Sequence, residues 1–384
     1  ETGIIGGASA KRPIRRDRSK KIQTIHKSIK NNHLMWLTSS SIGRKFVMAI
    51  TGICLVLFVT FHVLMNSVAL LWPAAYNQIC MFLGANWYAL IASAGLALLF
   101  IIHIIYALWL TVQNRKARGN DRYAVNAHYP GVEWSSKNML VLGIVVLAFL
   151  VVHLIQFWAK MQLQELMSHE LSVLPQVNDA PAAPEFGTLF LQAAFENWWT
   201  PVIYIIGFVA LWFHMNHGFW SMFQTIGWNG NIWLPRLKAI ACWWTSIVVL
   251  LFVAQAVLFT VQAKKQYFLT APALQEQYAE YWNERAQELI EEFQLETSTL
   301  DQTDPLAATT FFVDRGEYYS TAANAISEAA AKQAPDCKNA GQYLQQIGQF
   351  GQFVQQRTDY AKAQAAPKAV ETPAAEEAQT DSIN

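Results

Sequence analysis

The sequence predicts an all-α polytopic membrane protein, a bundle of five transmembrane helices followed by a helical, acidic C-terminal extension. Three observations lead to this fold class. Only 14% of the 384 residues are charged and 53% are apolar, whereas about 25% of residues are charged in an average soluble domain. Five apolar runs are each long enough for a bilayer, which needs about 20 residues. After the fifth run the chain becomes strongly acidic.

The first 45 residues form a basic segment ahead of the apolar runs. They contain eleven Lys or Arg against two acidic residues. A basic segment beside a membrane helix is commonly attracted to anionic lipid, and we therefore expect a cytoplasmic lipid-facing segment and no nucleic-acid partner. The segment lacks the apolar core of a signal peptide, so no cleavable signal is expected.

The five apolar runs define a transmembrane domain at residues 46–264. They cover Phe46–Trp72, Trp87–Val112, Met139–Met161, Pro201–Phe223 and Ala239–Ala263. The connections between runs 2 and 3 and between runs 4 and 5 are basic, whereas the connection between runs 3 and 4 holds five acids and no Lys or Arg. The positive-inside rule then predicts a cytoplasmic N-terminus and an extracytoplasmic C-terminus. We expect a multi-pass protein of the bacterial cytoplasmic membrane.

The extension is predicted to be a separate helical part of unknown role at residues 265–362, with a disordered acidic tail at 363–384. Gln266–Asn384 contains 18 acids and 7 bases, and residues 272–296 have the periodicity of an amphipathic helix. Cys80 and Cys337 would share the oxidising side of the membrane and could form a disulfide, if their Cα atoms lie within about 4.4–6.8 Å. The chain has no C-x-x-C motif, so we expect no zinc or iron–sulfur ligation by it.

Five of the nine histidines lie inside the apolar runs. His62 is in the first run, His103 in the second, His153 in the third, and His214 and His217 are in the fourth. Ionisable residues at membrane depth are rare and usually mark a function inside the bundle. A single histidine could be a hydrogen-bonded packing residue, but one in each of four successive helices favours a functional role.

The depths of four of these histidines alternate along the chain. Counted from the cytoplasmic edge of each run, His62 lies 17 residues from Lys45, His103 12 from Arg115, His153 16 from Lys137, and His214 14 from Trp228. At about 1.5 Å per residue, the two levels differ by about 3–8 Å. The alternation pairs His62 with His153 in the outer half of the membrane and His103 with His214 in the inner half.

Each of the two pairs places two histidines at one depth, and this pattern predicts two bis-histidine haems. Haem iron takes axial imidazole ligands, and an apolar shell helps to set its potential. With both axial positions filled, electron transfer is favoured over oxygen chemistry. The glycines agree with this arrangement, because Gly52 and Gly143 lie toward the inner level whereas Gly95 and Gly207 lie toward the outer one. Glycine is also common at helix contacts in membranes, which leaves that alternative open.

His217 leaves its role open. It follows His214 by three residues and lies on an adjoining helix face nearer the cytoplasm. It could replace His214 as a ligand, or it could bond a haem propionate or a quinone.

Four segments together resemble a known family. "GRKFVMAITGICLVLFVTFHVLMNS", "LLFIIHIIYALWL", "VVLAFLVVHLIQFW" and "FHMNHGFWSMFQTIGW" resemble the single-chain di-haem cytochrome b anchor of succinate dehydrogenase/fumarate reductase. The resemblance covers about residues 40–263. The H-x-x-x-G-[FLY]-[WY] pattern of the fourth run implies that His214, and not His217, is the ligand. The family pairs helix one with three and helix two with four, as the depth count does.

The resemblance implies a function in electron transfer. Such a subunit anchors a flavoprotein subunit, which carries FAD, and an iron–sulfur subunit to the cytoplasmic side of the membrane. Its two b-type haems pass electrons between the iron–sulfur clusters and a membrane quinone, which we expect to be menaquinone. The dicarboxylate chemistry would take place on the partner chains, and the complex could be a dimer of heterotrimers.

Lys160 is a further candidate at the outer end of the bundle. It lies seven residues beyond His153, about two turns along the same helix face, and could pair with the propionates of the outer haem. The alternative is a plain interfacial lysine.

Two other functions compete with the succinate:quinone anchor. One is a di-haem cytochrome b of another quinone-linked enzyme, of the formate dehydrogenase or hydrogenase type. The other is a haem-free transporter with a buried histidine relay.

Overall fold

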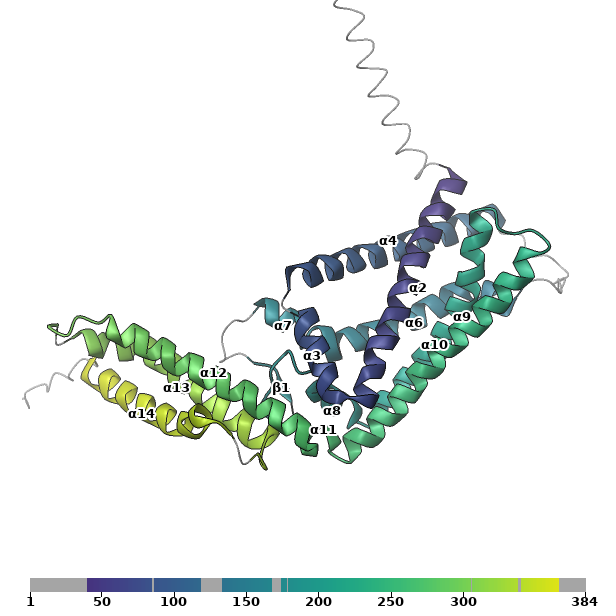
Figure 1. The fold of residues 1–384 in the computed structure, drawn as a ribbon. Coiled ribbons are helices and arrows are strands. Elements are labelled where there is room, and N and C mark those ends of the chain that lie inside the picture. The colour runs from purple at the N-terminus through teal and green to yellow at the C-terminus, as the bar shows by residue number, and fades with distance from the viewer. Residues whose placement is uncertain are drawn as a thin grey trace, which may run out of the picture. The chain divides into compact units, whose positions relative to one another are not determined.

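The computed structural model describes residues 40–84, 86–118, 133–167, 174–177, 179–304, 306–337 and 340–365. The described chain is almost wholly helical, which confirms the predicted fold class (Figure 1). Its helices are α2 (Ser41–Leu71), α3 (Pro73–Gly84), α4 (Trp87–Arg118), α5 (Trp134–Lys137), α6 (Met139–His153), α7 (Gln162–Met167), α8 (Gly187–Phe195), α9 (Trp199–Thr225), α10 (Trp233–Lys264), α11 (Tyr267–Thr270), α12 (Pro272–Ser298), α13 (Ala307–Gln333) and α14 (Gln342–Ala365). A π-helical stretch, η1 (Leu154–Trp158), continues α6. Two short strands, β1 (Gln176–Val177) and β2 (Ala180–Pro181), pair antiparallel.

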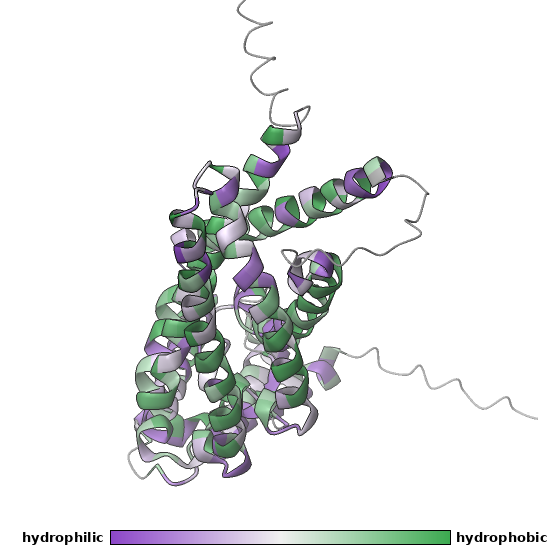
Figure 2. Cartoon of the chain, turned by 90° about the vertical axis from the view of Figure 1, so that its right-hand side faces the viewer, coloured by the Kyte–Doolittle hydropathy of each residue, from purple (hydrophilic) through white to green (hydrophobic). Residues whose placement is uncertain are grey.

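Five helices are long and apolar enough to cross a membrane. They span Ser41–Leu71, Trp87–Ala117, Met139–Trp158, Trp199–Thr225 and Trp233–Lys264, so each contains most or all of one predicted run, and no end differs by more than six residues. Large apolar side chains such as Leu57, Ile91 and Leu250 are more than 60% exposed on these helices, as lipid-facing residues are. In Figure 2 the helices nearest the viewer are mostly green, which marks hydrophobic residues, with purple, hydrophilic residues among them.

Local sequence signals fix the ends of several helices. The Oγ of Ser40 accepts a hydrogen bond from the Gly43 N–H at 2.8 Å and caps the start of α2. Helix α2 stops at Leu71 because Trp72 precedes Pro73, and a residue before proline is pushed out of the helical region. Proline then opens α3, where its missing N–H costs nothing.

The chain divides into two compact units. The first contains residues 1–156 and 194–261, and the second contains residues 157–193 and 262–384. In the first unit, α2 packs against α4 and α9, and α9 packs against α6. This division groups residues 157–193, which include most of the connection between the third and fourth spans, with the C-terminal extension, whereas the sequence analysis places them in the transmembrane domain at residues 46–264.

The second unit is built on three long helices, α12, α13 and α14, which pack side by side (Figure 1). The amphipathic helix predicted at residues 272–296 is α12. Its side chains Tyr278 and Trp282 are fully buried. The Trp282 indole donates a hydrogen bond to Oε1 of Gln333 at 2.8 Å, and the amide nitrogen of Gln333 donates to the backbone of Pro181 at 2.6 Å. These bonds attach the β1–β2 segment to the helices.

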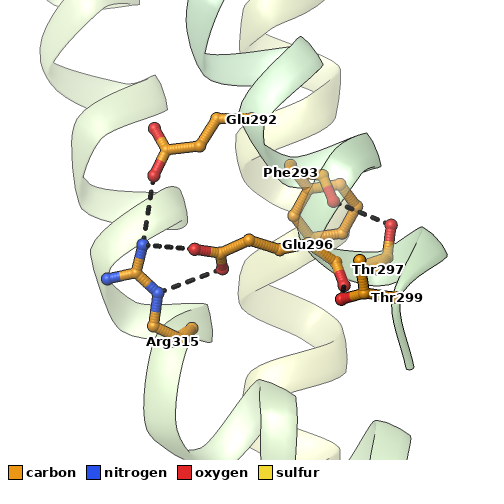
Figure 3. Close-up of polar contacts among 6 residues, drawn as sticks. All are labelled: Glu292, Phe293, Glu296, Thr297, Thr299 and Arg315. Atoms are coloured by element: carbon orange, nitrogen blue, oxygen red, sulfur yellow. Dashed lines mark hydrogen bonds and ion pairs between the residues drawn. The ribbon is translucent and has the colours of Figure 1, made fainter. Parts of the chain in front are cut away.

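Charged pairs lie on the surface of the second unit. Arg315 of α13 donates to both carboxylate oxygens of Glu296, at 2.9 and 3.1 Å, and to Glu292 at 3.1 Å (Figure 3). All three side chains are partly exposed. These bonds hold α12 to α13 at the rim of the helical core.

Some sequence predictions fall outside the described residues or stay open. Residues 1–39 of the basic segment and 366–384 of the predicted tail are not described. All four cysteines are described, and no disulfide joins any of them. Cys80 belongs to the first unit and Cys337 to the second, so the bridge between them stays a prediction.

Candidate functional site

Two pairs of histidines from four different spans meet inside the first unit. The ring centres of His62 on α2 and His153 on α6 lie 5.7 Å apart, with the ring planes at 82°. The ring centres of His103 on α4 and His214 on α9 lie 6.3 Å apart, at 65°. These are the two pairs that the depth count predicts. Their role as haem ligands stays a prediction.

The spacing within each pair fits two imidazoles on one metal ion. A histidine nitrogen binds a metal ion at about 2 Å, and the ring centre lies roughly 1 Å farther, given ring bonds of about 1.3 Å. Two imidazoles on one ion therefore have ring centres about 6 Å apart. The described residues contain no group of three or more His, Cys, Asp or Glu that could hold a metal ion. A centre held by two histidines would need its other ligands from a cofactor.

Aromatic rings surround the pair formed by His62 and His153. Phe58 stacks on His62 with ring centres 5.4 Å apart, and Phe252 lies 6.1 Å from the same ring. Phe149 lies 6.1 Å from His153. A carbon-rich shell of this kind lowers the local dielectric and is one of the means by which a protein sets a haem potential.

Glycines lie beside the pair formed by His103 and His214. A Cβ on Gly52 would stand 3.9 Å from the His103 ring, and a Cβ on Gly143 would stand 3.6 Å from the His214 ring. Helices α2 and α6, which carry the other pair, therefore present side-chain-free backbone here, as the sequence analysis expects. The two glycines expected toward the outer level behave differently. A Cβ on Gly207 would clash with the side chain of Phe149, whereas a Cβ on Gly95 would meet no atom of the described chain within 4 Å.

Polar side chains contact three of the four rings. The Nδ1 atom of His103 lies 3.1 Å from Oγ1 of Thr51, and Nδ1 of His153 lies 3.3 Å from the Tyr204 hydroxyl. Nε2 of His62 lies 3.2 Å from the amide nitrogen of Asn66. The fourth ring differs, because Nδ1 of His214 is buried and has no hydrogen-bond partner among the described residues.

His217 faces a charged cluster at the end of the bundle and not the His103 ring. Its Nδ1 lies 3.3 Å from Oε2 of Glu133, and Lys238 donates to Oε1 of Glu133 at 2.7 Å. Burial acts to raise the pKa of Glu133, but the bonds from Lys238 and His217 outweigh it and the pKa lies below its ordinary value. Lys238 also lies 4.4 Å above the ring of Trp220. A role of His217 toward a propionate or quinone stays a prediction.

The prediction for Lys160 assumed a regular helix beyond His153, and the structure differs there. Helix α6 ends at His153, and the chain continues as the π-helix η1 and then as turns. Because a π-helix has a wider turn than an α-helix, a spacing of seven residues does not keep Lys160 on the face of His153. Lys160 belongs to the second unit, and its proposed contact with the outer centre stays a prediction.

Sequence reasoning missed the residues that contact the rings. Asn66 follows His62 by four residues, so helical spacing alone could have found it. Thr51 precedes His62 by eleven residues and so lies three turns away on the same helix face. The sequence therefore shows only that a polar residue shares the face of His62, and not that it contacts His103. Tyr204 and Glu133 carry no such signal, because tertiary packing brings them to His153 and His217.

Comparison with known proteins adds no family to this geometry. No protein-family model, curated protein or solved structure matches the chain.

Proposed function

We propose that the chain is the cytochrome b membrane-anchor subunit of a succinate:quinone oxidoreductase, with two b-type haems. The observation that carries the proposal is the meeting of four histidines from four spans as two pairs, each at the spacing of two imidazoles on one metal ion. The order of the four histidine-bearing motifs along the chain supports the same family. The shell of aromatic rings and the glycines beside the rings fit a large planar cofactor.

The residues of the chain divide into holding and shielding roles. His62 with His153, and His103 with His214, would each hold the iron of one haem, and a haem bound there would supply one-electron transfer. Phe58, together with the aromatic residues of α6 and α10, excludes water from the outer pair. No open ligand position would remain at either centre, which favours electron transfer over oxygen chemistry.

The distribution of cations supports a cytoplasmic docking face. Every Lys and Arg among the described residues of the first unit lies at the end where α2 starts and α4 stops. Under the positive-inside rule, this end faces the cytoplasm. An iron–sulfur subunit and a flavoprotein subunit would dock there and carry out the dicarboxylate chemistry, while quinone exchanges electrons from the membrane.

The test is a reduced-minus-oxidised visible spectrum of the full chain purified from its native membrane, combined with identification of the co-purifying subunits. The proposal predicts b-type haem absorbance at two haems per chain, together with a flavoprotein and an iron–sulfur protein. Absorbance without the flavoprotein would favour an anchor of the formate dehydrogenase or hydrogenase type. A spectrum without haem would favour a transporter and would overturn the proposal.

A further inference from the structure

One ring of the inner pair is bonded to a hydroxyl group whose own proton is already in use. Oγ1 of Thr51 lies 3.1 Å from Nδ1 of His103, and also 3.0 Å from the carbonyl oxygen of Val47 and 3.1 Å from that of Met48. A carbonyl oxygen can only accept, and a hydroxyl group has one proton to donate. All three contacts are satisfied when Thr51 donates to the backbone and accepts from His103. The Nδ1 atom of His103 then carries a proton.

One ring of the outer pair has the same arrangement with different residues. The Tyr204 hydroxyl lies 2.9 Å from Oε1 of Gln156 and 3.3 Å from Nδ1 of His153. The amide nitrogen of Gln156 bonds to Oγ1 of Thr200 at 3.4 Å, so the amide presents its oxygen to Tyr204. The hydroxyl proton goes to that oxygen, and Tyr204 accepts from His153.

The two hydroxyl groups therefore select one tautomer of two rings. A neutral imidazole has one N–H, so a proton on Nδ1 leaves the lone pair on Nε2. Thr51 and Tyr204 are both buried, so water does not compete for these bonds. The facing rings are not held in this way, since Nδ1 of His214 has no partner in the described chain and His62 is bonded at Nε2. Each pair thus contains one ring with a fixed tautomer.

We propose that Thr51 and Tyr204 are positioning residues of the inner and outer centres, and that they hold His103 and His153 with Nε2 ready to bind iron. The inference rests on the proposed function, because it assigns the ligand atom of a haem. A histidine ligand that donates its other N–H to a neighbour becomes a more basic ligand. A more basic ligand stabilises oxidised iron, so each hydroxyl group lowers the reduction potential of its own centre.

The experiment measures the midpoint potentials of the full chain in its complex, by optical redox titration, for Thr51→Val and Tyr204→Phe. His214→Ala and His153→Ala each remove one centre, so the midpoint potential that remains in each variant belongs to the other centre. Thr51→Val should raise only the inner potential and Tyr204→Phe only the outer one, so each variant is the control for the other. A tenfold change in the preference for reduced iron corresponds to about 59 mV for a one-electron couple. Thr51→Ser, which restores the hydroxyl group, should return the inner potential to its original value.

Two haems with unshifted potentials in both variants would overturn this inference and leave the proposed function intact. A parent chain without haem would instead overturn the proposed function. If Thr51→Val fails to accumulate, Thr51→Ala removes the hydroxyl group without adding a branched apolar side chain. If Thr51→Ala and Thr51→Ser shift the inner midpoint potential equally, the shift is a packing effect, and this result would also contradict the role of the hydroxyl group.

Discussion

The two units of the chain place polar and apolar residues in opposite ways. In the first unit, Leu57 and Leu250 face outward while Thr51 and Gln255 are buried. In the second unit, Trp282 is fully buried and carboxylates such as those of α12 are exposed. Helices that associate within lipid gain little from apolar burial, so we interpret the buried polar side chains of the first unit as functional. In the second unit, the buried apolar side chains stabilise the fold.

The largest effects should follow changes to the interior of the first unit. Replacing His103 with alanine should remove one of two haems and sharply reduce electron delivery to quinone, because an axial ligand is lost. His62→Ala or His153→Ala should remove the other haem. Haem content per chain, read from the visible spectrum, measures this. The second unit should keep its resistance to protease in each variant, and loss of that resistance would show general misfolding.

A core change in the second unit should lower the stability of that unit and leave the haem content unchanged. Trp282→Ala removes a buried indole and its bond to Gln333, and such truncations typically cost about 3–5 kcal/mol. The urea dependence of protease cleavage between α12 and α14, in the solubilised full chain, measures the change. Trp282→Phe, which keeps most of the volume, should cost less. Haem content should stay unchanged in Trp282→Ala, because Trp282 lies in the second unit and the histidine pairs lie in the first, and a large loss of haem would contradict this expectation.

A pH-dependent effect is expected at Glu165 in the second unit. Its Oε2 atom is buried without a hydrogen-bond partner in the described chain. Burial, and secondarily the Glu185 carboxylate, raises the pKa of Glu165 to about 7. The folded chain then keeps this proton where the unfolded chain has lost it, so the free energy of unfolding should fall as pH rises from 4.5 toward about 7.

Glu165→Gln should remove that pH dependence and make the second unit more stable than the parent above pH 7. Denaturant-dependent protease cleavage at a series of pH values compares the two chains. Parallel pH profiles for parent and variant would mean that Glu165 does not titrate as described.

The smallest effect is expected at the surface of the second unit. The bond from Arg315 holds the pKa of Glu296 below its ordinary value. Exposed ion pairs contribute about 0–1 kcal/mol, so Arg315→Gln should lower the free energy of unfolding by no more than that near neutral pH. The loss should shrink as pH falls through the titration of Glu296, because the pair stabilises only the charged carboxylate. An effect as large as that of Trp282→Ala would contradict this.

The sequence predicts the first unit better than the second, for a physical reason. A span reveals itself as an apolar run, and its histidines stand out against that background, so the spans and the meeting of His62 with His153 could be foreseen. Helix α3 is short and only partly apolar, so no run marks it. Tyr204 and Glu133 act through contacts between elements far apart in the chain. The inclusion of residues 157–193 in the second unit likewise depends on long-range packing, such as the bond from Gln333 to Pro181.

The most direct test of the haem assignment compares His214→Ala with His217→Ala by low-temperature electron paramagnetic resonance of the oxidised, purified complex. His214 faces His103, whereas His217 faces Glu133. The account predicts two low-spin ferric haem signals in the parent chain and in His217→Ala, and one in His214→Ala. Two unchanged signals in His214→Ala, or the loss of one in His217→Ala, would contradict it.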